Sequence, residues 1–469
     1  MTGLAVVVLA AGEGKRMKSS LPKVLHRVAG RSLLGHVLAA LQGLDASRTV
    51  VVASARKDEI AETVGAEGFK GSLEFVVQDP PRGTGDAARL ALEALGDFDG
   101  SVLIVPGDTP LLSHDTLAAL MDEHTTTQAM ATVLTARVGD PAGYGRVIRD
   151  ELGAPARIVE HRDASSDELL VHEVNASVYV FNANRLSELI RKIDTDNDQG
   201  EYYLPDVIEL VVEAGEGVAA HRTDETEVAG VNSRVQLAQA AEAVRRRTCE
   251  YWMLEGVTIV DPATTYIDSA VTIGRDAVIA PFTFLEGSTT IADRAQVGPH
   301  SRIVSSEIEE EAVVSYSVVL NSSIGPSASV GPFASLRPGT RLERGAKIGT
   351  FVETKKTVVG EDSKANHLAY LGDAHIGRGV NIGAGTITCN WDGQKKNETV
   401  IEDEAYISSD TMLVAPVRIG KGAATGAGAV VRSDVPDGDL AVGMPARIIE
   451  GKGNRMSHET SDEEETGEN

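Results

Sequence analysis

Two hydrophobic patterns divide the 469-residue chain. In the first, which extends to about residue 231, short apolar runs rich in β-branched residues alternate with stretches of helix formers such as residues 84–94. The apolar runs are residues 4–8, 50–53, 73–77 and 102–105. Strands that alternate with helices are typical of α/β folds with a mostly parallel sheet. We therefore expect residues 1–231 to form an α/β domain.

A long helix is predicted after this domain. The segment SRVQLAQAAEAVRRRTCEYWML, residues 233–254, contains no Gly or Pro and is rich in helix formers. We interpret residues 232–254 as a linker helix that leads into a second domain, residues 255–450.

Beyond the linker the hydrophobic period changes to six. Aliphatic residues stand six apart in three series: Ile273, Ile279, Leu285, Ile291, Val297 and Ile303; Ile324, Val330, Leu336, Leu342 and Ile348; and Ile401, Ile407, Leu413 and Ile419. A helix, with a period of about 3.6, or a strand, with a period of about 2, does not sustain this spacing. Hexapeptide repeats of this kind form a parallel β-helix, in which each repeat makes one side of a triangular coil and points its aliphatic side chain toward the axis.

Composition narrows the classes of function. The formal net charge is −25, from 69 acidic and 44 basic residues, which argues against a nucleic-acid or anionic-membrane surface. Cys249 and Cys389 cannot form a disulfide framework, and no stretch approaches the ~18–20 apolar residues of a membrane span. These features predict a cytoplasmic protein. The acidic residues 451–469 lack an aliphatic run and are predicted to be a disordered tail.

A glycine loop with two cations follows the first apolar run, in the segment LAAGEGKRMKSSLPKVLH. Gly12 and Gly14 can adopt backbone angles closed to other residues and bring N–H groups against phosphate oxygens, while Arg16 and Lys23 add positive charge. The loop matches neither the P-loop pattern nor GxGxxG. We interpret it as a triphosphate cradle; the alternative is an ordinary turn with surface cations.

A magnesium ligand is predicted at the end of a strand. In VPGDTPLL, Asp108 follows the apolar run at residues 102–105, at the edge where open α/β sheets bind ligands. A carboxylate there can hold Mg²⁺ against a phosphate, and Asn232 is a candidate second ligand because Mg²⁺ needs few protein ligands. The alternatives are a turn residue for Asp108 and a helix N-cap for Asn232.

Motifs in both halves resemble one family of enzymes. The pattern of sugar-nucleotide pyrophosphorylases is matched, in order, by LAAGEGKRM, PKVLH, GTGDA, GDTPLL, GYGR, VEHRDA, QGEYYLPDVI and GVNSRVQLA. The second half adds RPGT, FVETKKTVVGEDSKANHLAYLGD and NIGAGTITCNWDG. Over about residues 4–435 the chain resembles the bifunctional bacterial enzymes that combine N-acetylglucosamine-1-phosphate uridyltransferase with glucosamine-1-phosphate acetyltransferase. The resemblance implies a Rossmann-like nucleotidyltransferase domain joined by the long helix to a left-handed parallel β-helix.

For the first domain, the resemblance implies condensation of N-acetylglucosamine 1-phosphate with UTP to give UDP-N-acetylglucosamine and pyrophosphate. It assigns Asp108 and Asn232 to Mg²⁺. It assigns substrate binding to Leu9, Ala10, Ala11, Gly12, Arg16, Lys23, Gln78, Gly83, Thr84, Gly143, Gly145, Glu160, Asn175 and Asn232. Within this set Arg16 and Lys23 meet the phosphates, residues 78, 83 and 84 meet the uracil edge, and residues 143, 160 and 175 hold the sugar. Without the family, Gly143 is a turn glycine and Glu160 a surface acid.

The chain departs from the family's usual pattern at three places: the family has Thr where Lys15 stands, His where Asp86 stands and Thr-Gly where Ala176-Ser177 stand. Lys15 adds a charge beside the expected triphosphate. Asp86 places a negative charge near a helix N-terminus, where it favours the helix dipole and repels a nearby phosphate. Ser177 adds a side chain where the backbone is expected to pass near the sugar.

For the second domain, the resemblance implies transfer of an acetyl group from acetyl-CoA to the amine of glucosamine 1-phosphate, the first of the two reactions. The hexapeptide register breaks between Ile348 and Ile376, and the interruption contains His367. An amine acceptor needs a base for its ammonium proton, and imidazole has a pKa near the working pH. His367 is therefore the candidate base, with Glu353 able to orient its ring; spacing alone leaves an inert loop histidine as the alternative.

The resemblance also supplies the other groups of this second site. It assigns substrate binding to Arg337, Lys355, Tyr370, Asn381, Asn390 and Lys396, and acetyl-CoA binding to Ala384, Ser409 and Ala427. Without the family, Lys355 is a solvated charge, Asn381 a stacking residue of a coil and Tyr370 a packed aromatic. The resemblance further implies a homotrimer with acetyltransferase sites between subunits. The ending LAVGMPARIIEG resembles the closing motif of other hexapeptide acyltransferases.

Two other functions fit parts of the pattern. A monofunctional sugar-1-phosphate nucleotidyltransferase would use the β-helix only for oligomerisation or regulation, and a scaffold subunit would keep the fold without the sites. The His-bearing, Lys-rich interruption disfavours the first alternative. The presence of Arg16, Lys23, Asp108, Asn232 and His367 disfavours the second.

Overall fold

The apolar runs of the first half form one nine-stranded sheet in the computed structural model, which describes residues 3–69 and 71–452. Along the sheet the order is β11 (Val218–Thr223), β7 (Ala131–Arg137), β10 (Glu173–Asn182), β6 (Gly100–Pro106), β1 (Gly3–Ala10), β4 (Arg48–Ala53) and β5 (Leu73–Val77). Strand β8 (Arg146–Arg149) pairs with β10 and with β9 (Pro155–Val159), and a separate hairpin consists of β2 (Arg27–Val28) and β3 (Arg31–Ser32). The pairs β1–β4, β1–β6, β4–β5 and β11–β7 are parallel, whereas β10 is antiparallel to its neighbours. This confirms the mostly parallel sheet.

Helices cover both faces of this sheet. They are α1 (Leu33–Leu41), α2 (Lys57–Ala66), α3 (Thr84–Leu95), α4 (His114–Thr127), α5 (Ala183–Leu189) and α6 (Asp206–Glu213), with short 3-10 turns at Lys15–Met17, Lys23–Leu25 and Glu168–Leu170. Because successive side chains of a strand point to opposite faces, Val7 of β1 packs in a core with α3, α5 and α6, and Val8 packs in a second core with α1, α2 and α4. Burial on both faces explains why the central strands are continuous apolar runs.

The predicted linker helix is α7 (Arg234–Leu254), and the chain divides within it into unit 1, residues 1–244, and unit 2, residues 245–469. Val244 packs with Met17 and Leu33 of unit 1, whereas Cys249 belongs to the core of unit 2. In the part of the chain that the structure describes, no helix is both long and apolar enough to cross a bilayer.

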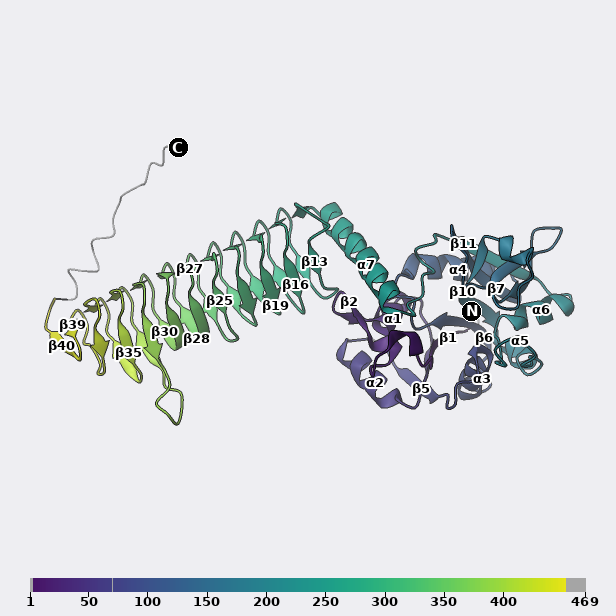
Figure 1. The fold of residues 1–469 in the computed structure, drawn as a ribbon, viewed down its shortest axis with the longest axis horizontal. Helices are drawn as coiled ribbons and strands as arrows, with labels where there is room; N and C mark the ends of the chain where they lie inside the picture. The colour runs from purple at the N-terminus through teal and green to yellow at the C-terminus, as the bar shows by residue number, and fades with distance from the viewer. Residues whose placement is uncertain (1–2, 70, 453–469) are drawn as a thin grey trace. The chain divides into compact units, whose positions relative to one another are not determined.

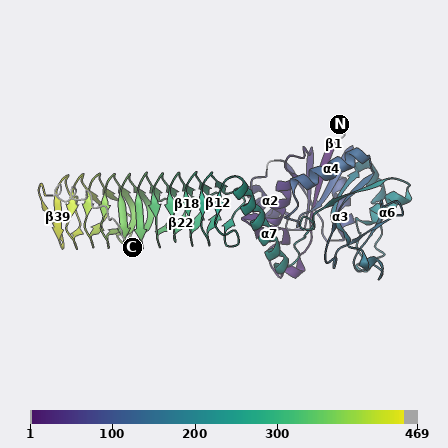
Figure 2. The same cartoon turned by 90° about the horizontal axis from the view of Figure 1, so that it is seen from above.

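Unit 2 is a left-handed parallel β-helix of stacked coils (Figures 1 and 2). Ile267 pairs with Leu285 and Leu285 with Ile303, so each of these coils takes three hexapeptides. The aliphatic residues of all three predicted series are buried, the most exposed being Ile273 at 7%. The hexapeptide prediction is therefore confirmed, and its physical basis is that one side chain in six fills the axis.

The strands of the β-helix form two sheets. The first consists of β12 (Thr258–Ile259), β15 (Val278–Ile279), β18 (Gln296–Val297), β21 (Val313–Val314), β24 (Ser329–Val330), β27 (Lys347–Thr350), β29 (Lys364–His367), β31 (Asn381–Ile382), β34 (Tyr406–Ile407), β37 (Ala424–Thr425), β39 (Leu440–Gly443) and β40 (Ala446–Ile449). The second consists of β13 (Tyr266–Ile267), β14 (Thr272–Ile273), β16 (Phe284–Glu286), β17 (Thr290–Ile291), β19 (Arg302–Val304), β20 (Glu307–Ile308), β22 (Val318–Leu320), β23 (Ser323–Ile324), β25 (Ser335–Leu336), β26 (Arg341–Leu342), β28 (Glu353–Val359), β30 (Tyr370–Ile376), β32 (Ile387–Cys389), β33 (Thr399–Ile401), β35 (Met412–Val414), β36 (Val417–Ile419) and β38 (Val430–Val431).

The stack of β-helix coils continues through the predicted interruption around His367. Ile348 pairs with Ala365, and Ala365 pairs with Ile382, so the coils remain in register. The change is local: β28 is a longer strand that pairs with both β25 and β26. At the other end, β39 and β40 form an antiparallel hairpin. Of the tail predicted to be disordered, residues 453–469 lie outside the described residues.

Candidate active sites

A cavity of about 700 Å³ lies at the carboxyl ends of β1 and β6 in unit 1. Its size falls within the ~300–1,000 Å³ of typical small-molecule sites. Of the residues predicted for the first site, the following line it: Leu9, Ala10, Ala11, Gly12, Arg16, Lys23, Gln78, Gly83, Thr84, Asp108, Glu160 and Asn232. The structure therefore brings together side chains that are more than two hundred residues apart in the chain.

The glycine loop positions Lys23. Gly14 has a φ of 61°, and a Cβ atom built on it would lie 2.7 Å from the Cβ of Lys23. Gly14 is therefore needed both for its left-handed backbone and for the close packing of the lysine stem. Lys15 differs from Lys23, because its side chain is 86% exposed and its ammonium group forms a 2.6 Å ion pair with Glu13.

Asp108, Asn232 and Lys23 meet at one point of the cavity. The ammonium group of Lys23 donates a short hydrogen bond to Asp108 Oδ2 and a 3.0 Å bond to Asn232 Oδ1. A bond from the backbone N–H of Val231 to the carbonyl oxygen of Asp108, 2.9 Å long, holds the two segments together. The side chains of Lys23 and Asp108 are only 12% and 15% exposed. Two oxygen atoms thus converge on one cationic group. Oxygen atoms of this kind are the ligands that a hard cation such as Mg²⁺ prefers.

Of the residues predicted to hold the sugar, Glu160 lines the cavity. Burial raises the pKa of the Glu160 carboxyl, and the nearby carboxylates of Asp206 and Asp163 raise it further. Asn175 is buried and donates a 2.6 Å bond from Nδ2 to the hydroxyl of Tyr179, so it supports a residue that lines the cavity. Gly143, Gly145 and Asn175 are not themselves lining residues. Gly145 lies behind Glu160: a Cβ atom built on it would be 3.2 Å from Glu160 Oε1.

Several lining residues were missed at the sequence level. They are Glu13, Val24, Pro80, Pro81, Ala87, Pro106, Tyr179, Glu201, Leu204 and Pro205, together with Ser177, which was noted only as a departure and has a φ of 57°. The segment at 201–204 lies over the start of α3: the carbonyl oxygen of Tyr202 accepts from the N–H of Gly85 at 2.8 Å, and Thr84 Oγ1 accepts from the N–H of Leu204 at 3.0 Å. The motif QGEYYLPDVI marked this segment, but its contact with α3 depends on the tertiary structure.

The β-helix carries a cluster of three cations, Arg337, Lys355 and Lys396, which we call the cation cluster. The pKa of Lys355 lies below its usual value because the ammonium group of Lys396 is a close like-charged neighbour and Arg337 adds to the repulsion. Lys396 Nζ lies 3.7 Å from Asp373 Oδ2. A group of cations this close creates a positive potential that favours an anion.

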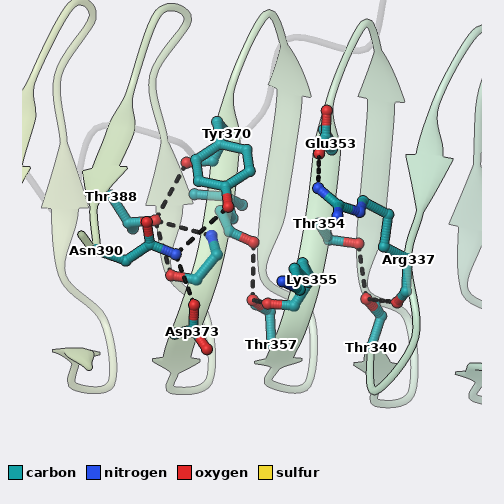
Figure 3. Close-up of polar contacts among 12 residues, drawn as sticks. Arg337, Thr340, Glu353, Thr354, Lys355, Thr357, Tyr370, Asp373, Thr388 and Asn390 are labelled. Carbon is teal, nitrogen blue, oxygen red and sulfur yellow. Dashed lines mark hydrogen bonds and ion pairs between the residues drawn. The ribbon is translucent and has the colours of Figure 1, made fainter. Parts of the chain in front are cut away.

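Polar side chains surround the cation cluster (Figure 3). Lys355 lies between the ion pair of Arg337 with Glu353, 2.8 Å long, and a group in which Asn390 contacts both Tyr370 and Asp373. Asn390 Nδ2 lies 3.3 Å from the hydroxyl of Tyr370 and 2.6 Å from Asp373 Oδ2. Asp373 was missed in the sequence, where nothing marked it apart from its place in the motif HLAYLGD.

His367 aligns with the small residues predicted to contact acetyl-CoA. Strand β29 pairs with β31, β31 with β34 and β34 with β37, and in this register the equivalent positions of successive coils are His367, Ala384, Ser409 and Ala427. Each of the four precedes a corner residue with positive φ. The column therefore runs along one edge of the β-helix from an exposed imidazole over three small side chains.

Two further predicted residues are Glu353 and Asn381. Glu353 bonds to Arg337, and among the described contacts none joins Glu353 to His367, so the orienting role of Glu353 stays a prediction. Asn381 lies on β31, where it pairs with Lys364 of the strand that carries His367.

Comparisons with known proteins cover both units. Residues 6–170 match the MobA-like NTP transferase domain. The chain is 51% identical over 453 residues to a Thermobifida fusca protein named Bifunctional protein GlmU, a match covering 95% of this chain and 93% of that protein. Proteins of the same name from Exiguobacterium sibiricum and Carboxydothermus hydrogenoformans are each 48% identical, over 93% and 94% of this chain and 96% and 98% of their own lengths.

Proposed function

Since the chain belongs to the family of bifunctional GlmU proteins, we propose how its own residues carry out the family's two reactions. It acetylates glucosamine 1-phosphate with acetyl-CoA and then transfers a uridylyl group from UTP to N-acetylglucosamine 1-phosphate, which makes UDP-N-acetylglucosamine. The match across both units disfavours the monofunctional and scaffold alternatives. We assign uridylyl transfer to residues 1–231, the linker to 232–254 and acetyl transfer to 255–450.

In uridylyl transfer, a phosphate oxygen of the sugar phosphate attacks the α-phosphorus of UTP, and pyrophosphate leaves with the electron pair of the broken P–O bond. Positioning and charge neutralisation account for most of the catalysis in such a displacement. We assign the neutralising charges to Arg16 and Lys23 and the phosphate-facing N–H groups to the glycine loop. The cavity at the ends of β1 and β6 supports this assignment, because it gathers the loop with Gln78, Gly83 and Thr84.

We assign Asp108 and Asn232 to Mg²⁺. Their oxygens already converge on the ammonium group of Lys23, so they fit a small hard cation. When bound there, Mg²⁺ would supply positive charge beside the phosphates. With Mg²⁺ bound to these oxygens, the ammonium group of Lys23 is free to bind the phosphates of UTP. For the sugar, we assign its hydroxyl and acetamido groups to Glu160, Gly143 and Asn175.

In acetyl transfer, His367 takes a proton from the ammonium group of glucosamine 1-phosphate. The free amine attacks the acetyl carbonyl carbon, the C–S bond breaks, and the CoA thiolate leaves and is protonated by the imidazolium. The nitrogen releases its second proton to solvent and becomes the amide. The observation that carries this assignment is the register of His367 with Ala384, Ser409 and Ala427, which gives an extended acyl carrier a path of small side chains to the base.

The cation cluster is the proposed site for the sugar phosphate. Lys396 and Arg337 repel the ammonium group of Lys355, and a phosphate dianion offsets that repulsion. Phosphate binding to Arg337 would also release the carboxylate of Glu353, which we propose then orients His367. Tyr370, Asn381 and Asn390 are assigned to the sugar ring and the intermediate.

The experiment that tests both sites measures two products in one preparation. We expect pyrophosphate from Mg²⁺, UTP and N-acetylglucosamine 1-phosphate, and free thiol from acetyl-CoA and glucosamine 1-phosphate. His367→Ala should abolish thiol release and leave pyrophosphate release unchanged, whereas His375→Ala, which removes an exposed histidine of β30, should leave both. If His375→Ala reduced thiol release as much as His367→Ala, the assignment of the base would be wrong.

We also propose a homotrimer formed through the β-helix. An aromatic ladder runs along one corner of the coils, with ring centroids 4.7–5.7 Å apart, and consists of Phe282, His300, Tyr316, Phe333 and Phe351. The four carbocyclic side chains of this ladder are 41–60% exposed, and an exposed apolar strip of this kind marks an interaction surface. It continues to Leu368, beside His367, so a neighbouring copy that covers it would reach the acetyl-transfer site.

Sedimentation velocity tests the trimer. We expect a mass of three chains for the natural protein, dissociation in Phe351→Asp, and a parallel loss of thiol release. Phe284→Asp, which charges an exposed ring outside the ladder, is the matched control and should keep the trimer. A monomeric natural protein with full thiol release would contradict the proposal.

A further inference from the structure

The side-chain amide of Gln78 is held in one orientation. Gln78 follows β5 at the edge of the cavity and is 4% exposed. Its Nε2 donates a 3.0 Å bond to the carbonyl oxygen of Gly83 and a 2.9 Å bond to Asp86 Oδ2. Both hydrogens of the amide nitrogen are therefore used, and Oε1 is the polar atom left for a ligand in the cavity.

Asp86 is what makes the opposite orientation unfavourable. A reversed amide would place Oε1 against two acceptors, the Gly83 carbonyl and the Asp86 carboxylate. Asp86 is itself immobilised: it is 7% exposed, and its Oδ1 accepts a 2.6 Å bond from Arg89 one turn along α3. Burial raises the pKa of the Asp86 carboxyl, but the bonds from Gln78 and Arg89 outweigh it, so the pKa lies below its usual value and the group is an ionised, pure acceptor.

We propose that Asp86 is a positioning residue for base selection, which fixes the carbonyl of Gln78 toward the base of the incoming nucleotide. A fixed acceptor matches uracil or thymine, whose N3 carries a hydrogen, and opposes cytosine, whose N3 is an unprotonated acceptor. The inference rests on the proposed assignment of Gln78 to the uracil edge. It gives Asp86, which stands where the family usually has histidine, a role in specificity, whereas the sequence alone suggested a charge that favours the helix dipole and repels a nearby phosphate.

The test is the ratio of kcat/KM for UTP to kcat/KM for CTP in pyrophosphate release. In Asp86→Asn the new amide nitrogen faces either the Arg89 donor or Gln78. When it faces Gln78, it can donate to Oε1 only if the Gln78 amide reverses. The reversed Gln78 amide then presents NH₂ to the base. We expect the ratio to fall roughly 10- to 100-fold. Glu93→Gln is the matched control, because Glu93 accepts a 2.6 Å bond from the same Arg89 at an exposed position and should leave the ratio unchanged. Asp86→His restores one lone pair for Gln78 Nε2 and should recover most of the ratio.

Three further measurements separate the outcomes. The rate of thiol release and the melting temperature, taken on the same preparations, show whether the rest of the chain is intact. If Asp86→Asn lowers the rates with UTP and CTP equally, Asp86 has a merely structural role and the proposal is wrong. If Gln78→Ala raises KM for UTP while Asp86→Asn leaves the ratio unchanged, the assignment of Gln78 stands and the proposal for Asp86 fails. If Gln78→Ala leaves KM for UTP unchanged, both are overturned.

Discussion

The cation cluster predicts a measurable effect for Lys396→Met on acetyl transfer. Lys396 lies in the chain between β32 and β33, with its ammonium nitrogen 3.7 Å from Asp373 Oδ2 and its side chain 42% exposed. A hydrogen bond from a charged group contributes about 1.5–3 kcal/mol, and partial exposure places Lys396 at the low end of that range. Removing Lys396 also relieves the repulsion that lowers the pKa of Lys355, which offsets part of the loss.

The expected net loss is about 1.4 kcal/mol of phosphate binding, equivalent to about a tenfold higher KM for glucosamine 1-phosphate. Because the proposed role of Lys396 is to bind the phosphate and not the reacting amine, kcat should change less than about twofold. The assay is thiol release at varied sugar phosphate and two salt concentrations. A cluster reduced from three cations to two should also show a weaker rise of KM with salt.

The neighbouring lysine offers a matched control. Lys395→Met removes the same charge from the same loop, but Lys395 acts on Asp392, whose pKa it helps to lower, and not on the cluster. We expect its KM to stay within about twofold of the natural protein. Equal KM changes in Lys395→Met and Lys396→Met, or a fall in kcat at unchanged KM, would refute the reasoning.

Three further predictions concern unit 1. Gly83→Ala should destabilise unit 1 by at least ~2 kcal/mol and abolish pyrophosphate release while thiol release continues. The reason is that Gly83 has a φ of 104° and that a Cβ atom there would lie 2.5 Å from the carbonyl oxygen of Tyr202. Calorimetry of the unfolding of unit 1 checks this. Burial, then the charge of a neighbouring carboxylate, raises the pKa of Asp206 to about 6, so the native state binds more protons than the unfolded state between about pH 4 and 6, and stability falls as the pH rises through that window. Asp206→Asn should therefore be more stable than the natural protein by about 1–2 kcal/mol above pH 6 and equal to it below about pH 4, as measured by urea unfolding. Lys23→Met leaves the carboxylate of Asp108 without its cation and should lower the free energy of unfolding by about 1–3 kcal/mol in a metal-free buffer. Mg²⁺ should raise the melting temperature more in this variant than in the natural protein, because the metal no longer competes with the ammonium group. An equal rise in both proteins would count against a position shared by Mg²⁺ and the ammonium group.

Local patterns were sufficient to predict most of the architecture. The six-residue series predicted the β-helix because each coil must bury one aliphatic side chain per face, a demand repeated in every hexapeptide. The runs at residues 50–53, 73–77 and 102–105 predicted central strands because burial on both faces makes them uniformly apolar. Local patterns also predicted the glycine loop and Asp108 as candidate site groups, because each follows directly on the end of an apolar strand.

The parts of the sites that were missed depend on contacts between distant segments. Glu201 lines the cavity of unit 1 because the segment around Tyr202 forms hydrogen bonds to the start of α3, which lies more than a hundred residues earlier in the chain. Asp373 joined the second site because coils stack, which places it beside Asn390 of the next coil. No periodicity in the sequence records such pairs, since each partner looks like an ordinary surface residue on its own.

The amino-acid sequence by itself determined the two folds and the long helix between them, and it supplied the candidate groups for phosphate, metal and proton, because those properties follow from local periodicity and side-chain chemistry. Only the tertiary structure decided which of these groups meet. It placed Lys23 between Asp108 and Asn232, set Glu353 against Arg337, aligned His367 with three small residues of later coils, and turned the carbonyl of Gln78 away from Asp86. The physical reason is that hydrogen bonds and ion pairs act over a few ångströms, and chain topology alone determines which distant residues come within that range.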